Sequence, residues 1–263
     1  MPKQPRPKMY WELAPWFHLV THPRSYAGEV RWVRRQLLPR PRAAKPTMLE
    51  LGSGGGNNAL HLKKHFQLTL TDLSPHMLSV SREINPDCEH ITGDMRTLRL
   101  KRQFDVVFAH DAISYITTVR DLQRTIATVF AHCRPGGVAL LQPDNVRETF
   151  RPSRDSGGHR IDGRAVRYVE LTHPLKPGRD STTVDYTLML KDRNGTTRKL
   201  ADRHHIGVFA RAVWLDVLRA QGFRARAIVD PWKRVCFLAR RPLTECDTPT
   251  QNNKTTRTTR SKP

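Results

Sequence analysis

The chain has 263 residues, 38% of them hydrophobic, so we expect one large core with an embellishment rather than two equal domains. Its 45 lysines and arginines against 24 acidic residues give a formal charge of +21, which attracts phosphates without specificity. No apolar run reaches the roughly 20 residues of a membrane helix, no secretory signal is seen, and four scattered cysteines give neither a disulfide framework nor a Cys-x-x-Cys zinc pattern. We therefore expect a cytoplasmic protein without membrane contact.

Residues 1–46 contain an aromatic-rich stretch, MYWELAPWFHLVTHPRSY, which includes Trp11 and Trp16. We expect this stretch to form an N-terminal helical lid whose tryptophans reach substrate. Ordinary aromatic packing of a helix explains the same residues equally well.

Residues 47–150 alternate between short apolar strands and amphipathic helices. Ser74 and Pro75 predict a helix start after the second strand, and Leu122 and Ile126 share one face of a later helix. This rhythm predicts parallel strands joined by right-handed crossovers. The strands are expected at 47–51, 67–72, 104–109 and 137–142.

A bare turn, LGSGGGNN, follows the first strand and opens a helix. Glycines there allow positive φ and let a ligand approach the main chain. The spacing Gly54-x-Gly56-x-x-Ala59 with Asp72 also satisfies the dinucleotide fingerprint, so the glycines alone leave a nicotinamide-dependent dehydrogenase open. Glu50, at the strand tip, would repel a pyrophosphate but attract an amino or sulfonium cation.

Residues 151–207 predict a small antiparallel β insertion after the fifth strand, with Asn194-Gly195 as a hairpin turn. The stretch RPSRDSGGHRIDGR suggests a mobile flap, whose Arg151, Arg154 and Arg160 can hold an acidic substrate, or a disordered connector. Residues 208–243 are expected to return to the core with a helix and the last strand pair. Residues 244–263 are expected to form a disordered basic tail.

The motifs TDLSPHML, GDMRTL, FDVVFAHDAISYI and CRPGG follow the bare turn in order. From about Met48 to Thr149, this set resembles the class I S-adenosylmethionine-dependent methyltransferases, and within them the small-molecule enzymes of sugar N-methyltransferase type. The resemblance implies an α/β, Rossmann-like, doubly wound and mostly parallel sheet of seven strands. It also implies S-adenosylmethionine as cofactor.

The resemblance further implies roles around the cofactor: Glu50 for the methionyl amino group; Gly52, Gly54 and Gly56 for the floor; Asp72 for the ribose hydroxyls; Leu73 and Met77 for the adenine; Asp94 and Met95 for its amino group and ring. Simpler explanations stand beside three of these roles. Asp72 can cap the following helix, Met77 can be ordinary core, and Asp94 can belong to a turn.

Candidate catalytic residues follow the fourth strand, where ligands of parallel sheets bind: His110 beside the sulfonium, Asp111 as orienting or deprotonating group, and Tyr115 as hydrogen-bonding partner or wall. Asp111 and Tyr115 can equally be structural. In the insertion, Tyr186, His204 and His205 are expected to reach substrate, and either histidine can accept a proton or be merely structural.

We expect methyl transfer to an amine or hydroxyl of a small molecule. A nucleic-acid methyltransferase, suggested by the basic charge, is an alternative, as are a noncatalytic cofactor-binding protein and a dehydrogenase. The loop after the fourth strand lacks the Asn/Asp-Pro-Pro-aromatic pattern of base-amino methyltransferases. No metal is expected, because His61 and His65 have no third ligand. The oligomeric state is not predicted.

Overall fold

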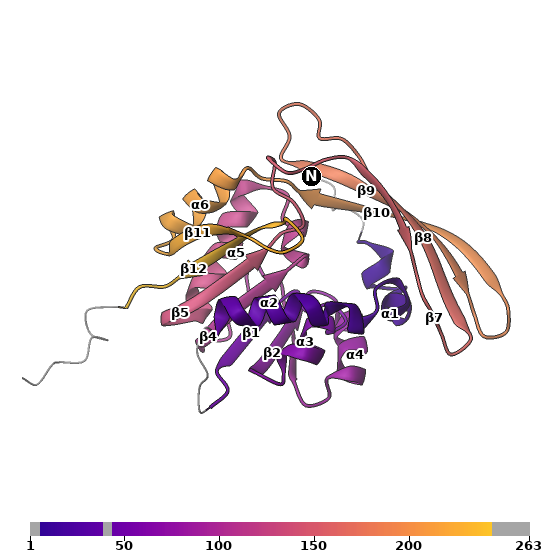
Figure 1. The fold of residues 1–263 in the computed structure, drawn as a ribbon, viewed down its shortest axis with the longest axis horizontal. Coiled ribbons are helices and arrows are strands. Elements are labelled where there is room, and N and C mark those ends of the chain that lie inside the picture. The colour runs from indigo at the N-terminus through magenta and orange to yellow at the C-terminus, as the bar shows by residue number, and fades with distance from the viewer. Residues whose placement is uncertain (1–5, 39–43, 244–263) are drawn as a thin grey trace, which may run out of the picture.

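The computed structural model describes residues 6–38 and 44–243, and consists of two sheets with part of the N-terminal segment between them (Figure 1). Residues 1–5 and 39–43 of the expected lid and the expected basic tail at 244–263 lie outside the described residues. Among the described residues, no helix has both the length and the apolar character that crossing a membrane requires.

Sheet A has seven strands in the order β11-β12-β5-β4-β1-β2-β3, and only β12 runs antiparallel to its neighbours. This confirms the predicted α/β class and the mostly parallel seven-stranded sheet. Its strands are β1 (Thr47–Leu51), β2 (Gln67–Asp72), β3 (Glu89–Thr92), β4 (Phe104–His110), β5 (Cys133–Gln142), β11 (Arg224–Val229) and β12 (Val235–Arg240).

Helices cover both faces of sheet A because its strands are apolar on both sides. Leu49 and Leu51 of β1 face one helical layer, and Met48 faces the other. The first layer is α5 (Val119–His132) and α6 (Arg211–Ala220); the second is α2 (Ala27–Leu37) and α3 (Asn57–Leu62). The helix α4 (Pro75–Ile84) packs beside β2 and β3, and Ser74 caps it by accepting a hydrogen bond from the Met77 amide.

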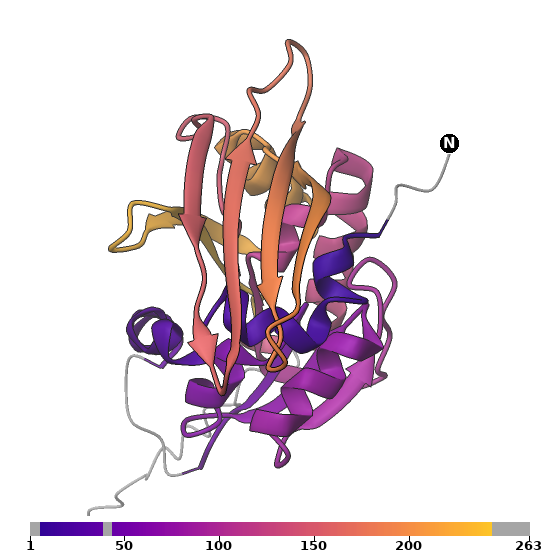
Figure 2. The same ribbon diagram turned by 90° about the vertical axis from the view of Figure 1, so that its right-hand side faces the viewer.

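Sheet B is the antiparallel insertion, with strands in the order β10-β9-β8-β6 and β7 paired to β8. It stands over the carboxyl ends of the parallel strands of sheet A, and its long strands are seen face-on in Figure 2. The predicted hairpin at Asn194-Gly195 joins β9 to β10. The strands are β6 (Ser153–Gly157), β7 (Arg160–Ile161), β8 (Arg164–Thr172), β9 (Ser181–Lys191) and β10 (Thr197–Gly207).

The stretch expected as a flap or disordered connector is instead the edge of sheet B, which corrects the prediction. Its polar composition suggested a loop, but β6 pairs with β8 from Ser153 opposite Thr172 to Gly157 opposite Tyr168. Gly158 makes the close approach to β8 possible: its φ is 121°, and a Cβ there would lie 2.1 Å from the Val166 carbonyl oxygen.

The N-terminal segment runs from sheet B back to sheet A. Met9, Leu13 and Trp16 pack against Val166 and Leu188 of sheet B. The segment consists of η1 (Lys8–Tyr10), η2 (Ala14–Trp16), α1 (Phe17–Val20) and η3 (Pro23–Tyr26), which precede α2. It therefore closes the space between the two sheets along one side (Figure 1).

Candidate active site

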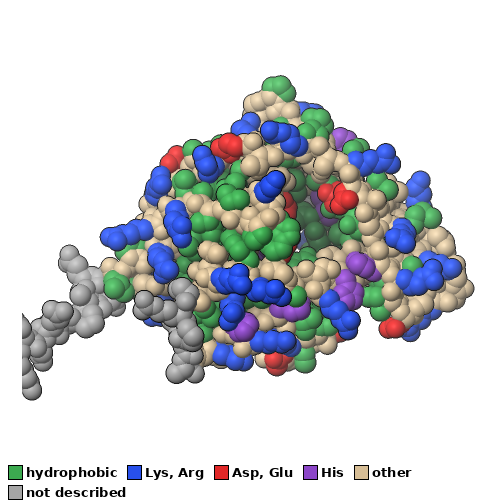
Figure 3. Space-filling view, viewed as in Figure 1, with side chains coloured by type: hydrophobic (Ala, Val, Ile, Leu, Met, Phe, Trp, Pro, Cys, Tyr) green, Lys and Arg blue, Asp and Glu red, His purple; other side chains and the backbone are tan. Residues whose placement is uncertain are grey.

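One large cavity, of about 740 Å³, lies between the carboxyl ends of sheet A and the inner face of sheet B. It opens on the face shown in Figure 3 as a hollow between the two sheets. Its walls come from the loops after β1 to β5, from β8, β9 and β10, and from the N-terminal segment. Parallel strands bring these loops to one edge although they are far apart in the sequence.

The glycine turn after β1 forms the floor on the sheet A side. Gly52, Gly54 and Gly56 all have positive φ, of 72°, 54° and 78°. A Cβ on Gly52 would lie 2.4 Å from the Ala112 Cβ, so this position admits no side chain. A Cβ on Gly54 would meet nothing closer than 3.7 Å, and its main chain is open to the cavity. Gly56 does not line the cavity; it begins α3 instead.

Glu50 lies at the end of β1 under this turn and is 1% exposed. Its Oε2 atom has no hydrogen-bond partner, and the same holds for Ser53 Oγ and Asn58 Oδ1 nearby. Burial raises the pKa of Glu50 to about 7, although His110 and a hydrogen bond from Asn58 oppose the shift. A buried carboxylate with a free oxygen beside a bare turn is the environment that an ammonium group would satisfy.

Asp72, at the end of β2, holds the turn in place. Its carboxylate accepts hydrogen bonds from the backbone amides of Gly54 (2.9 Å) and Ser74 (2.8 Å), and it lines the cavity. Burial raises the pKa of Asp72. Each carboxylate oxygen keeps a second lone pair, so these bonds leave acceptor capacity toward the cavity.

Three further residues expected around the cofactor also line the cavity: Leu73, which is 54% exposed, Asp94 and Met95. The Asp94 carboxylate accepts bonds from the Arg96 guanidinium, the shortest 2.7 Å. Met77 does not line the cavity. It is fully buried, with its Cε behind Gly54, and packs with Ala14 and Val80 as core.

His110, at the end of β4, belongs to a buried ionic cluster that the sequence did not predict. Its Nε2 lies 2.8 Å from Glu29 Oε2, and its Nδ1 lies 3.2 Å from Asp111 Oδ2. Arg234 lies 3.1 Å from Glu29 and 2.7 Å from Asp230. Although burial opposes the charge, the Asp111 and Glu29 carboxylates raise the pKa of His110 to about 8, so the imidazole is cationic at neutral pH.

Asp111 faces the cavity from a strained backbone, with φ of 30° and ψ of −49°. Strain of this kind persists where the surrounding contacts impose it. Burial and the neighbouring Asp111 carboxylate raise the pKa of Asp144 well above its ordinary value. Asp111 and Asp144 thus face the cavity together as a pair of acidic side chains.

All five tyrosines of the chain line this one cavity: Tyr10, Tyr26, Tyr115, Tyr168 and Tyr186. The Tyr186 hydroxyl donates to Glu170 Oε2 (2.8 Å), and Glu170 lines the same wall. Tyr115 lies between Tyr10 and His204, with oxygen–oxygen and oxygen–nitrogen distances of 2.8 and 2.6 Å. Rings and hydroxyls of this kind suit a ligand that is apolar on its faces and polar on its edges.

Of the five residues expected to reach substrate, three line the cavity and two do not. Trp11, Tyr186 and His204 line the cavity. Trp16 does not: it is 5% exposed and packs against sheet B, with the Arg164 guanidinium 3.7 Å from its ring centre. His205 is half-buried and points to the opposite face of β10 from His204, as strand alternation requires.

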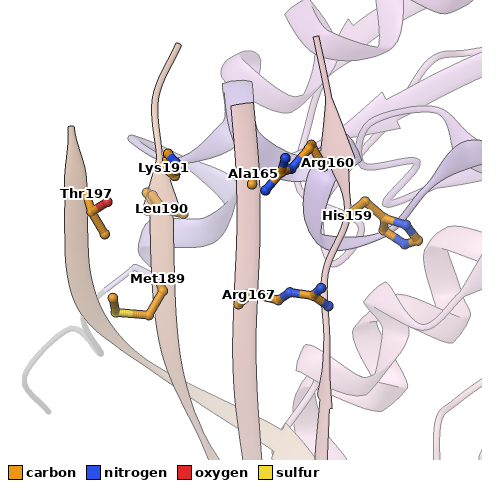
Figure 4. A pocket seen from close by; sticks show the side chains of 8 residues that line it. All are labelled: His159, Arg160, Ala165, Arg167, Met189, Leu190, Lys191 and Thr197. Atoms are coloured by element: carbon orange, nitrogen blue, oxygen red, sulfur yellow. The ribbon is translucent and has the colours of Figure 1, made fainter. Parts of the chain in front are cut away.

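A smaller hollow of about 230 Å³ lies on sheet B (Figure 4). Arg160, Arg167 and Lys191 are among its walls, and His159 lies at one end. His159 also lines the large cavity, where its ring is 5.6 Å from that of His22. The basic hollow thus adjoins the large cavity through His159.

Sequence reasoning missed Glu170, which lines the cavity, and three charged residues that lie behind its wall: Glu29, Asp202 and Arg234. Glu29 lies in a helix otherwise explained by packing, and Arg234 follows a strand pair far along the chain. Glu170 and Asp202 each stand two residues from an aromatic or histidine in a strand, and this shared-face spacing was the available signal.

Residues 48–137 match the family described as "Methyltransferase domain". The chain is 30% identical over 204 residues to the dTDP-3-amino-3,4,6-trideoxy-alpha-D-glucopyranose N,N-dimethyltransferase of Streptomyces venezuelae, over 76% of this chain and 84% of that protein. The crystal structure of Streptomyces venezuelae DesVI superposes with a TM-score of 0.77 at 27% identity, covering 88% of this chain and 97% of that one.

A second solved structure is SAM-bound CalS10, an amino pentose methyltransferase from Micromonospora echinaspora, with a TM-score of 0.70 at 25% identity, covering 88% and 96% of the two chains. These findings support an enzyme that uses S-adenosylmethionine and none of the dehydrogenase, scaffold or nucleic-acid alternatives. The bare turn and the unsatisfied Glu50 carboxylate fit that cofactor's ammonium end. The chain belongs to the family of S-adenosylmethionine-dependent methyltransferases that includes the sugar N,N-dimethyltransferases.

Proposed function

We propose that this enzyme methylates the amino group of a nucleotide-linked amino sugar in the cytoplasm. The observation that carries the proposal is the charge of the cavity wall. Five acidic side chains line it, and among the described residues the only lysine or arginine that does so is Arg96, which is bound to Asp94 and Asp121. Such a wall attracts a cationic amine and repels an anionic acceptor. The acidic side chains are Asp72, Asp94, Asp111, Asp144 and Glu170.

On the sheet A side, we assign the cofactor to the glycine turn and its flanking acids. Glu50 would pair with the ammonium group, Gly52 and Gly54 would admit the chain of the ligand, and Asp72 would accept from the ribose hydroxyls. When bound, S-adenosylmethionine supplies an electrophilic methyl group on a sulfonium. Leu73, Asp94 and Met95 would hold the adenine, while Gly56 and Met77 support the turn from behind.

On the opposite side, we assign the acceptor amine to Asp111 and its partner Asp144. The acidic pair attracts an ammonium, and Tyr115 and Tyr10 offer oxygen atoms to its hydrogens. His110 Nδ1, 3.2 Å from Asp111 Oδ2, orients Asp111 from beneath. Held in this way, the nitrogen lies in a walled site where alignment supplies much of the rate.

The diphosphate of the nucleotide would leave the acidic wall and lie toward the basic hollow. His22 and His159 meet at that rim, and Arg160 lies beyond it at the edge of sheet B. Separate acidic and basic zones match an acceptor with an ammonium at one end and a diphosphate at the other.

The division of labour follows the expected segments. We propose that residues 1–46 act as lid, 47–150 and 208–243 as cofactor-binding core, and 151–207 as substrate cap. The five tyrosines fit this division, since they come from the lid, the core and the cap.

The test compares two acceptors that differ only in carrying an amino or a hydroxyl group at the same carbon. Purified enzyme is incubated with S-adenosylmethionine and either a dTDP-3-amino sugar or its 3-hydroxy counterpart. The masses of the products are then measured by mass spectrometry. The proposal expects one and two added methyl groups on the amino sugar and none on the hydroxy sugar. Methylation of the hydroxyl alone, or of neither compound, would refute it.

A further inference from the structure

Asp202 of β10 is a buried carboxylate whose partners come from two different parts of the chain. Its side chain is 4% exposed. It accepts hydrogen bonds from the backbone amides of Lys8 (2.9 Å) and Met9 (2.8 Å), and its Oδ2 lies 2.9 Å from His204 Nε2. It therefore joins the N-terminal segment to sheet B. It lies directly beside His204, which contacts Tyr115 in the cavity wall.

A chain of hydrogen bonds runs from Asp202 to the cavity wall. His204 Nδ1 is 2.6 Å from the Tyr115 hydroxyl, which is 2.8 Å from the Tyr10 hydroxyl. His204 is 1% exposed, and both tyrosines line the cavity. The order Asp202, His204, Tyr115, Tyr10 is thus continuous from a buried charge to the site of the acceptor.

The charge at one end determines the direction of every bond. Burial opposes ionisation, but hydrogen bonds from His204, Met9 and Lys8 lower the pKa of Asp202 below its ordinary value. A carboxylate only accepts, so His204 Nε2 carries the hydrogen, and in the neutral imidazole Nδ1 then keeps a lone pair. Tyr115 must then donate to Nδ1, and Tyr10 must donate to Tyr115. The Tyr10 oxygen is left with its lone pairs as acceptors toward the cavity.

We propose that Asp202 is a positioning residue that fixes this direction, so that the Tyr10 oxygen receives the proton that the acceptor amine must lose. The inference rests on the proposed amine substrate. The ammonium N–H bond breaks as its proton passes to Tyr10, the Tyr10 proton passes to Tyr115, and the Tyr115 proton passes to His204 Nδ1. The amine keeps the electron pair of the broken bond. The imidazolium rests against Asp202 until the reverse shift returns the proton to the cavity after product leaves.

Burial raises the pKa of Tyr10 and of Tyr115, so neither ring ionises by itself and the proton must move along the whole chain. The titratable groups facing His204 are Tyr10 from η1, Tyr115 from the short helix η4 (Ala112–Tyr115), Tyr186 from β9 and Asp202 itself. Because Asp202 also holds the Lys8 and Met9 amides, the acceptor at Tyr10 is completed only when the N-terminal segment is docked.

The test is the Asp202→Asn variant, with Asp185→Asn as its matched control. Asp185 lies on the next strand, facing away from the cavity, and binds Arg203 and His173. In nitrogen-15 spectra without any ligand, His204 should carry hydrogen on Nε2 in the wild type and on Nδ1 in Asp202→Asn. Loss of the signal in His204→Gln identifies it. Finding hydrogen on Nδ1 in the wild type would overturn the inference.

The turnover number kcat is the second measurement that tests the inference. Asp202→Asn should lower kcat about ten- to a hundredfold at neutral pH, with cofactor affinity within about twofold, and the deficit should shrink as pH rises and the free amine loses its own proton. Asp185→Asn should match the wild type. Equal turnover of the two variants, or a deficit that is the same at every pH, would overturn the inference.

Should Asp202→Asn fail to fold, Tyr115→Phe breaks the chain while leaving the Lys8 and Met9 bonds intact, and it should show the same deficit that high pH relieves. Full activity of Tyr115→Phe at neutral pH would overturn the inference. If the wild type methylates no amine, the proposed function fails, and the nitrogen-15 result still reports the hydrogen-bond direction separately.

Discussion

The cofactor side of the cavity is made largely of backbone and of residues close together in the sequence, whereas the acceptor side is made of side chains from distant segments. Gly52 and Gly54 follow β1, and Asp72 ends the neighbouring β2. Backbone amides of the turn donate to the Thr71 carbonyl oxygen and to the Asp72 carboxylate. Tyr10, Tyr115 and His204 meet across separations of 105 and 89 residues. The first side depends on conformation, and the second depends on how the lid and sheet B are placed.

Gly52→Ala should have the largest effect, because it changes the conformation on which the cofactor side depends. The new methyl group would lie 2.4 Å from the Ala112 Cβ at a φ of 72°. We expect cofactor affinity, measured by isothermal titration, to fall at least about a hundredfold, with about 2 kcal/mol lost in stability. Gly195→Ala is the control: φ is 86° but nothing lies within 4 Å, so stability falls while affinity does not. Equal affinity in both variants would contradict the role of the turn.

Glu50→Gln should weaken cofactor binding about tenfold or more while stabilising the ligand-free protein by about 2 kcal/mol. The folded pKa, about 7, lies above the ordinary value of 4.5, so the ionised carboxylate costs stability that protonation restores as pH falls through 7. Cofactor affinity of the wild type should therefore decline below about pH 7, and that of Glu50→Gln should stay flat. Thermal unfolding and titration across pH check both. A wild-type cofactor affinity that does not change with pH would contradict the assignment of Glu50 to the ammonium group. The control is Glu89→Gln, because Glu89 is a half-exposed carboxylate of β3.

Asp111→Asn should separate the two sides, raising the KM for the amine about tenfold and leaving cofactor affinity unchanged, because it removes an acidic side chain from the acceptor side of the cavity. Asp144→Asn should change KM less than about threefold, since burial and the neighbouring Asp111 raise the pKa of Asp144 well above its ordinary value. Steady-state kinetics on both variants decide. The reverse order of effects would show that the charge resides on Asp144.

His205→Ala should have the smallest effect, within about twofold of wild-type kcat and KM, since His205 lies on the face of β10 turned away from the cavity. His204→Ala, one residue away, should lower kcat. Comparable losses in the two variants would contradict the placement of sheet B.

The contrast between the two sides also explains what the sequence could predict. The glycine turn, Asp72 and the parallel strands of the core follow from local patterns, because parallel strands bring successive loops to one edge. The lid and sheet B obey no such rule. Trp11 and Trp16 share one aromatic segment, yet only Trp11 lines the cavity. The Glu29–His110 contact joins α2 to β4, and nothing in either segment indicated the other.

The most direct test of the account is a crystal structure with S-adenosylhomocysteine and a dTDP-amino sugar bound together. It should place the homocysteine ammonium beside Glu50, and the sugar amine within hydrogen-bonding reach of Tyr10 and Asp111. Electron density for the sugar on the outer face of sheet B, or a cofactor that leaves Glu50 unpaired, would contradict it.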